Sequence, residues 1–300
     1  MTTYFATTND DLQQILNNAE PFSTIRLAKG VYRQKLEIDV DGLSIVGESA
    51  ENTVISYGDY AKKTDEKGVE YNTFRTYTVA VCANNISLHN ITVQNDSGNS
   101  PQNGQEVALS VYGDNFTADS CRFLSEQDTL FCGPLPKDLI ARYDGFLKNK
   151  LRRDITSKQR YINCVIAGTV DFIFGCGDCL FENCTIVSLS DGRHGFVAAP
   201  AHALEQKIGF VFNACVFEGS DKLDSKIFLA RPWRDYGKAS FINCQYGDHI
   251  IKDGFDKWND TERDKTARFA EYGVDRTGRA AWSKELTRNE ADILLKYFNK

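Results

Sequence analysis

Two aspartates lie among apolar residues in the sequence, where a charged side chain is not expected. Asp128 lies in the segment Glu-Gln-Asp-Thr-Leu-Phe, and Asp171 lies between Val170 and Phe172. Burying a carboxylate among apolar side chains costs free energy unless the group is paired or takes part in chemistry. Two neighbouring carboxyl groups have their pKa values pushed apart, so that one keeps a proton while the other is ionised. Either aspartate alone would fit a turn or a cap, but the pair predicts catalysis.

Polar groups suited to carboxyl chemistry lie near this pair in the sequence. Gln127 precedes Asp128, and Gln105 precedes an alternating segment; side-chain amides are good donors to an oxyanion. Arg231 ends a strand-like segment, and an arginine in such a place can hold a carboxylate with two hydrogen bonds. Trp233, two residues later, can stack on a sugar ring. The sequence contains no Gly-x-Ser-x-Gly elbow, histidine triad signature, phosphate loop or dinucleotide motif.

A repeat marked by cysteines indicates the elements that hold these residues. In each copy, alternating apolar and polar residues lead to a small residue or asparagine and then to the repeated position. This position is occupied by Ile91, Cys121, Cys164, Cys184, Cys215 and Cys244. The successive spacings of 30, 43, 20, 31 and 29 residues are typical of a solenoid of β-coils. We therefore predict an all-β fold, a single-stranded right-handed parallel β-helix with these cysteines as small core residues.

The repeat also predicts how the two aspartates lie relative to one another. Asp128 and Asp171 each follow a repeat cysteine by seven residues, so stacked coils would place them on one face. Asp191 has the same offset from Cys184, but its polar surroundings favour a surface role.

Both ends of the chain depart from the repeat. Residues 9–19 form an amphipathic helical pattern with Asn9 or Asp10 as the N-cap. Residues 287–298 begin with a capping box. We expect these helices to cover the open ends of a single domain spanning residues 1–300, because exposed sheet edges invite aggregation.

A segment rich in basic residues at about 132–160 interrupts the repeat and accounts for the spacing of 43 residues. Its length predicts about one extra coil. Its charges are interpreted either as a solvated face or as a basic wall beside a groove that receives an acidic polymer.

Composition restricts the possible partners. A net charge of −6 disfavours nucleic acid, and no stretch of 18 apolar residues predicts a membrane span. The first 20 residues lack the basic and apolar regions of a signal peptide, and the nine cysteines are odd in number. We therefore expect reduced thiols in the cytoplasm, or secretion if a leader has been removed. The lone Cys176-x-x-Cys179 pair lacks the second half of a zinc site. We expect a monomer.

Several segments, in order along the chain, carry a family resemblance. They are Gly30–Tyr32, Gln105–Leu109, Gln127–Phe131, Gly168–Gly175, Leu229–Trp233, Arg268–Tyr272 and Gly278–Trp282. In these segments the chain resembles the pectin methylesterases, which are β-helical, pectin-lyase-like carbohydrate esterases. The resemblance implies an esterase that uses no metal and no cofactor. Its implied substrate is methylesterified homogalacturonan or methylated oligogalacturonides, whose galacturonate methyl esters it would hydrolyse with release of methanol.

The resemblance also implies roles for individual residues. Asp171 matches the nucleophile, and Asp128 matches the general acid that later serves as a base. Gln105 and Gln127 match the oxyanion donors, and Arg231 matches the group that positions the nucleophile. The substrate-binding positions that we expect are Trp233, Phe131, Phe172 and Tyr32.

Some features depart from the family pattern, and other functions remain open. The two aspartates are 43 residues apart, where the family has about one coil, and Pro200 stands where many relatives have glutamine. A polygalacturonase-like glycoside hydrolase would also place aspartate pairs on a β-helix. A non-catalytic solenoid would bind pectin without hydrolysing it. The ester could also be acetyl rather than methyl.

Overall fold

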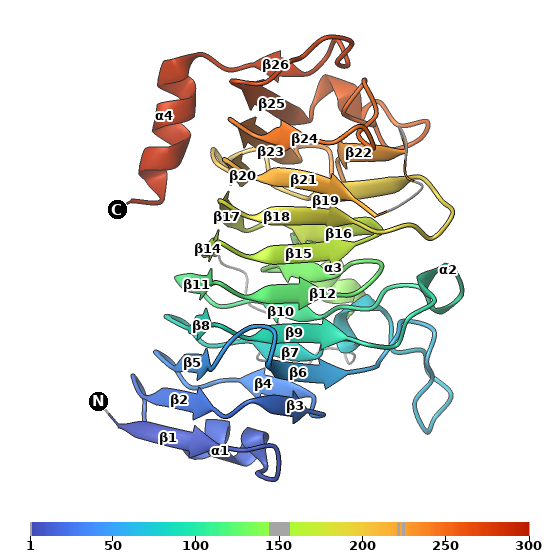
Figure 1. The fold of residues 1–300 in the computed structure, drawn as a ribbon. Coiled ribbons are helices and arrows are strands. Elements are labelled where there is room, and N and C mark those ends of the chain that lie inside the picture. The colour runs from blue at the N-terminus through green and yellow to red at the C-terminus, as the bar shows by residue number, and fades with distance from the viewer. Residues whose placement is uncertain (1, 144–156, 221–222, 224–225, 300) are drawn as a thin grey trace.

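The chain winds into a right-handed parallel β-helix, which rises from the N-terminus at the bottom of Figure 1 to the C-terminal strands at the top. The computed structural model describes residues 2–143, 157–220, 223 and 226–299. Within these residues, successive coils contribute strands to three sheets, and the strands of neighbouring coils pair in parallel. The predicted fold is confirmed.

The bounds of the elements are as follows. The 11-stranded sheet contains β1 (Thr3–Ala6), β2 (Thr24–Leu27), β5 (Ser44–Gly47), β8 (Ser87–His89), β11 (Phe116–Asp119), β14 (Lys158–Ile162), β17 (Asp178–Glu182), β20 (Phe210–Asn213), β23 (Lys238–Ile242), β25 (Arg268–Tyr272) and β26 (Lys284–Glu285). The 7-stranded sheet contains β4 (Leu36–Ile38), β7 (Val79–Val81), β10 (Leu109–Val111), β13 (Leu130–Cys132), β16 (Val170–Gly175), β19 (Gly195–Pro200) and β22 (Ile227–Ala230). The 8-stranded sheet contains β3 (Gly30–Tyr32), β6 (Thr53–Tyr57), β9 (Thr92–Asn95), β12 (Arg122–Leu124), β15 (Val165–Gly168), β18 (Thr185–Ser188), β21 (Val216–Gly219) and β24 (Gln245–Tyr246).

The described helices are short. They are α1 (Leu12–Asn18), α2 (Ser100–Asn103), α3 (Lys137–Arg142), α4 (Arg288–Tyr297) and two 3-10 turns at Thr73–Arg75 and Arg263–Lys265. Among the residues described, no helix has both the length and the apolar character needed to cross a membrane.

The cysteine repeat is a tight turn that leads from the 11-stranded sheet into the 8-stranded sheet. The residue before each repeat position has a φ between 51° and 55°, at Asn90, Ser120, Asn163, Asn183, Ala214 and Asn243. Asparagine tolerates this left-handed conformation better than most residues, which explains its recurrence. The residue at each repeat position is buried, and the nine cysteines of the chain are buried and form no disulfide. The repeat cysteines therefore serve the core, as predicted.

Ladders of like side chains fill the space between the sheets. Tyr161, Phe181, Phe212 and Phe241 stack in successive coils, with ring centroids 4.9, 4.6 and 4.8 Å apart. Offset stacking of this kind adds to the stability that the buried apolar area supplies. One apolar cluster extends from β1 to β25, so the coils share a continuous core.

The inserted segment at about 132–160 does not form an extra coil, so that prediction is wrong. β12 pairs directly with β15, and β13 pairs directly with β16, so no coil lies between them. The segment leaves the solenoid after β13, forms α3 and rejoins it at β14. Four of the eight basic residues of the predicted basic wall, Lys148, Lys150, Arg152 and Arg153, lie in residues 144–156, outside the described residues.

The two terminal helices occupy different places. α1 covers the N-terminal end, where Leu12 and Leu16 join the core, and its N-cap is Asp11 rather than Asn9 or Asp10. α4 has the predicted capping box, but it lies along the side of the stack in Figure 1. There it packs on an outward apolar strip of the 11-stranded sheet formed by Leu180, Val211 and Ile242. These three side chains would otherwise face water, which explains why α4 covers the sheet rather than the end.

Candidate active site

Asp128 and Asp171 lie side by side on the outer face of the 7-stranded sheet. Because Leu130 is paired with Ile173, the two aspartates occupy equivalent positions in neighbouring coils. The backbone amide of Asp128 donates to the carbonyl of Val170 at 3.0 Å, which ties the coils together at this point. Each aspartate is only 8% exposed. The equal offsets in the sequence thus correspond to a real stack.

Both aspartates have a strained backbone. Their φ values are 62° for Asp128 and 51° for Asp171, in the left-handed region that few residues other than glycine, asparagine and aspartate adopt. The register of β16 against β19 also shifts across Asp171. Such irregularities re-aim side chains next to functional sites. The strained backbone conformation is therefore found at the two positions whose carboxyl groups project from the sheet at the same level.

The glycines of the Gly168–Gly175 motif permit the close coil contacts around Asp171. A Cβ on Gly168 would lie 2.6 Å from the carbonyl oxygen of Glu126, and a Cβ on Gly175 would lie 2.1 Å from the carbonyl oxygen of Cys132. Neither position therefore accepts a side chain without movement of the neighbouring coil.

Arg231, which follows β22, holds the carboxylate of Asp171 with two hydrogen bonds. Its Nε donates to Oδ1 at 2.8 Å and its terminal nitrogen donates to Oδ2 at 2.7 Å. The guanidinium lies between two aromatic rings, 3.7 Å from the centroid of Phe196 and 4.1 Å from that of Trp258. Stacking and the two-pronged ion pair fix both the plane and the position of this arginine.

Charge and burial act differently on the pKa values of the two carboxyl groups. Burial raises the pKa of Asp128 well above its ordinary range, and the nearby charge of Asp171 raises it further. Burial also raises the pKa of Asp171, but the charge and hydrogen bonds of Arg231 oppose that effect. The proton of the pair is therefore held by Asp128, while Asp171 is the anion. This is the division of roles expected of a proton donor beside a nucleophile.

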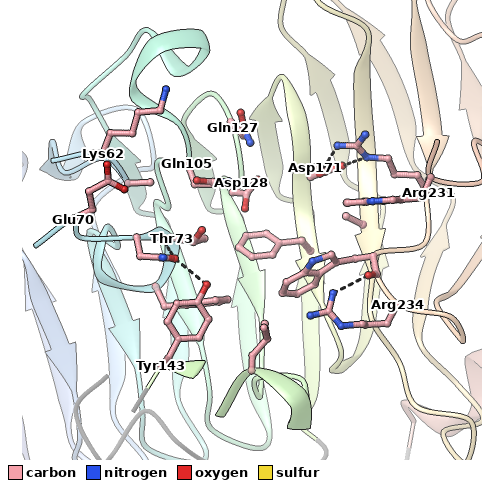
Figure 2. Close-up of a pocket in the computed structure, with 18 residues that line it drawn as sticks. Lys62, Glu70, Thr73, Gln105, Gln127, Asp128, Tyr143, Asp171, Arg231 and Arg234 are labelled. Carbon is pink, nitrogen blue, oxygen red and sulfur yellow. Dashed lines mark hydrogen bonds and ion pairs between the residues drawn. The ribbon is translucent and has the colours of Figure 1, made fainter. Parts of the chain in front are cut away.

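A cavity of about 530 Å³ opens over the pair, and Figure 2 shows the residues around it. Gln105 and Gln127 lie near Asp128 in Figure 2, and Trp233 also lines the cavity. The ring of Trp233 is supported edge-on by Phe174, with the centroids 5.8 Å apart. The structure thus brings together six residues that the sequence had suggested: Asp128, Asp171, Gln105, Gln127, Arg231 and Trp233.

Three expected substrate-binding residues lie outside the cavity, and their assignment needs correction. Tyr32 is fully buried, and its hydroxyl donates to the backbone carbonyls of Ala6 and Ala28. Phe172 is fully buried in the main core. Phe131 is covered by the ring of Phe74, whose centroid is 4.9 Å away. These aromatic side chains support the coils and the cavity floor instead of contacting a ligand.

Other residues of the cavity were not suggested by the sequence. They are Lys62, Glu70, Tyr143, Arg234 and Trp258, together with Asn72, Thr73 and Leu139. Tyr143 links the end of α3 to the segment before the first 3-10 turn, because its hydroxyl donates to Oδ1 of Asn72 at 2.8 Å. Arg234 forms an ion pair with Asp138 of α3 at 2.7 Å. These residues come from segments far apart in the chain and share no spacing or motif that signals a common site.

The arrangement suits attack on a carboxyl carbon. It combines an anionic carboxylate, a neighbouring protonated carboxyl group and two amide side chains beside one cavity. Within the residues that the structure describes, no group of three or more His, Cys, Asp or Glu side chains is arranged to hold a metal ion. The chemistry that these carboxyl and amide side chains could support is acyl transfer.

Comparisons with known proteins show the family to which the chain belongs. The sequence profile of the family described as Pectinesterase matches residues 1–134 and 153–293. Pectinesterase QRT1 of Arabidopsis thaliana is 33% identical over 286 residues, which cover 90% of this chain and 67% of that protein. A pectin methylesterase solved in complex with a hexasaccharide has a TM-score of 0.80 at 24% identity, covering 97% of this chain and 95% of the other. The pectin methylesterase from carrot has a TM-score of 0.78 at 22% identity, with coverage of 100% and 97%. The chain belongs to the pectinesterase family of carboxylic ester hydrolases.

Proposed function

We propose that the protein hydrolyses the methyl esters of galacturonate residues, with Asp171 as the nucleophile and Asp128 as the general acid and base. The observation that carries the proposal is the Asp171–Arg231 pair, beside a second carboxyl group whose pKa is raised well above its ordinary range by burial and by the charge of Asp171. An ionised nucleophile next to a proton donor is what ester cleavage requires.

In the first half of the reaction, a carboxylate oxygen of Asp171 attacks the C6 carbonyl carbon of the ester. The resulting oxyanion accepts hydrogen bonds from the side-chain amides of Gln105 and Gln127, which line the cavity next to Asp128. The bond from C6 to the methoxy oxygen then breaks, and Asp128 supplies the proton with which methanol leaves. The products of this half are methanol, an acyl-enzyme anhydride on Asp171 and an ionised Asp128.

In the second half, water attacks the same C6 carbon while Asp128 takes a proton from it. The bond between C6 and the oxygen of Asp171 breaks, which restores the carboxylate of Asp171 and leaves a galacturonic acid carboxyl group. Asp128 is again protonated, so the cycle closes. Throughout both halves, Arg231 keeps the oxygens of Asp171 in place through its two hydrogen bonds.

The lining of the cavity supports an acidic sugar polymer or oligomer as the substrate. Trp233 offers a ring face for a sugar, while Lys62 and Arg234 supply positive charge near the walls. A related pectin methylesterase has been solved with a hexasaccharide bound. These features favour methylated homogalacturonan or its oligomers over a small ester.

The test is to measure methanol release and new reducing ends together, on methylated tri- to hexagalacturonate and on highly methylated pectin. We expect methanol without new reducing ends, and an Asp171→Ala variant that keeps its fold but releases none. New reducing ends would instead identify a glycoside hydrolase. Binding of the oligomers without any product would identify a carbohydrate-binding solenoid. Release of acetate but not methanol from pectin would show that the enzyme cleaves acetyl esters rather than methyl esters.

A further inference from the structure

An ion pair outside the catalytic set lies beside the oxyanion donors. It is formed by Asp191 and Arg193 in the turn between β18 and β19. The carboxylate of Asp191 accepts from the backbone amide of Arg193 at 3.0 Å and from its Nε at 2.9 Å. The Asp191 side chain is only 6% exposed, although the sequence had suggested a surface role. Hydrogen bonds to both the backbone and the guanidinium hold this arginine in one orientation.

Arg193 reaches from this turn to the coil that carries Asp128. One terminal nitrogen of its guanidinium donates to Oε1 of Gln127 at 3.2 Å. A guanidinium has only donors, so the group that faces it must be the carbonyl oxygen of the glutamine amide. The NH₂ group of Gln127 is therefore directed away from Arg193. Gln127 lies above Asp128 at the rim of the cavity in Figure 2, where that NH₂ group can meet the oxyanion.

The other terminal nitrogen of Arg193 donates to the hydroxyl of Ser100 at 3.2 Å. Ser100 begins α2, the short helix that leads to Gln105. The backbone amide of Ser100 donates to the carboxylate of Glu126, the residue before Gln127. A single guanidinium thus contacts both chain segments that carry the oxyanion donors.

We propose that Arg193, held by Asp191, is a positioning residue that orients the amide of Gln127 toward the oxyanion. The inference rests on the proposed function, because the oxyanion exists only if the enzyme cleaves an ester. Arg193 is 40% exposed, so the competing role is direct contact with the substrate. The two roles differ in the kinetic constant that they affect: orienting a donor lowers kcat, whereas a lost substrate contact raises KM.

A double-mutant cycle separates these roles. Arg193→Met, Gln127→Ala and the double variant are compared with the parent by methanol release, and Arg33→Met, in an exposed ion pair with Asp96, is the matched control. Removing an oxyanion donor costs about 10²- to 10³-fold in kcat. We expect Arg193→Met to lower kcat by about tenfold to a hundredfold with little change in KM, because a misdirected donor still contributes in part. In the Gln127→Ala background the same substitution should have almost no further effect.

Further variants and outcomes complete the test. Arg193→Lys retains a donor to Oε1 of Gln127 and should recover much of kcat. Asp191→Asn keeps Arg193 but removes the negative charge that fixes its guanidinium, so kcat should fall several-fold. If Arg193→Met does not fold, Asp191→Asn replaces it in the cycle. An equal loss in both backgrounds, or a rise in KM alone, would overturn the positioning role. A parent protein without esterase activity would overturn the proposed function as well, so the two failures are distinguishable.

Discussion

Glu106 gives the sharpest prediction about stability. Its side chain is fully buried, and neither carboxyl oxygen has a hydrogen-bond partner among the described residues. Burial, and next the negative charge of Glu126, raise its pKa from 4.5 to about 7, and the nearby polar side chains of Asn103 and Ser97 oppose the rise only in part. Such a displacement corresponds to about 3 kcal/mol at 25 °C. Ionising this carboxyl group should therefore cost a large part of the stability of a typical domain.

The sign of the effect follows from proton binding. The folded state binds the proton of Glu106 more tightly than the unfolded chain, because the folded-state pKa is the higher of the two. The stability that the protonated group contributes is complete below about pH 4.5 and is lost as the pH rises through about 7. Glu106→Gln has the same shape but cannot ionise, so it should not lose stability through this group.

The assay is denaturant unfolding of the parent and of Glu106→Gln from pH 5 to 8.5. The free energy of unfolding of the variant, relative to the parent, should rise by about 3 kcal/mol at most across this range. A constant offset between the two proteins carries no weight, since a buried amide without partners has its own cost. Glu51→Gln, at an exposed position, is the matched control and should show no such rise. A difference that stays flat with pH would refute the reasoning.

Further predictions concern catalysis. Arg231→Lys should lower kcat for methanol release by about tenfold to a hundredfold, because a lysine cannot keep both hydrogen bonds to Asp171; near-parental turnover would contradict this. Trp258→Leu removes one of the two rings stacked on Arg231 and should cost about twofold to thirtyfold in kcat. Asp138→Asn frees Arg234, so KM should fall about two- to fivefold for partly de-esterified oligomers but not for fully methylated ones. Equal KM changes for both substrates would exclude a carboxylate contact.

The sequence was informative where one residue in each coil has the same physical task. The asparagine and cysteine of the repeat recur because each coil needs a left-handed turn followed by a small buried side chain. That regularity was enough to predict the solenoid and to place Asp128 level with Asp171. The insertion could not be assigned in the same way, since its length resembles a coil, whereas the coils before and after it pair directly with one another.

The aromatic residues show why the lining of the site was predicted less well. Phe172 immediately follows an aspartate that faces the cavity, and neighbouring side chains in a strand point to opposite faces. Its burial could therefore have been inferred from the sequence. Trp258 gave no such signal, because it belongs to no strand and reaches Arg231 only through the path of its loop. Tertiary contacts between distant loops decide which aromatic rings line the cavity.

The backbone at the two aspartates links the stability of the solenoid to its chemistry. A left-handed backbone costs free energy, and Asp128, in the turn before β13, and Asp171, in β16, occupy that conformation at equivalent positions in neighbouring coils. Both carboxyl groups line the cavity, where burial and the charge of Asp171 keep a proton on Asp128. The many strand pairs of the stack hold this strained geometry in place, so the coils stabilise a site that local structure alone would not adopt.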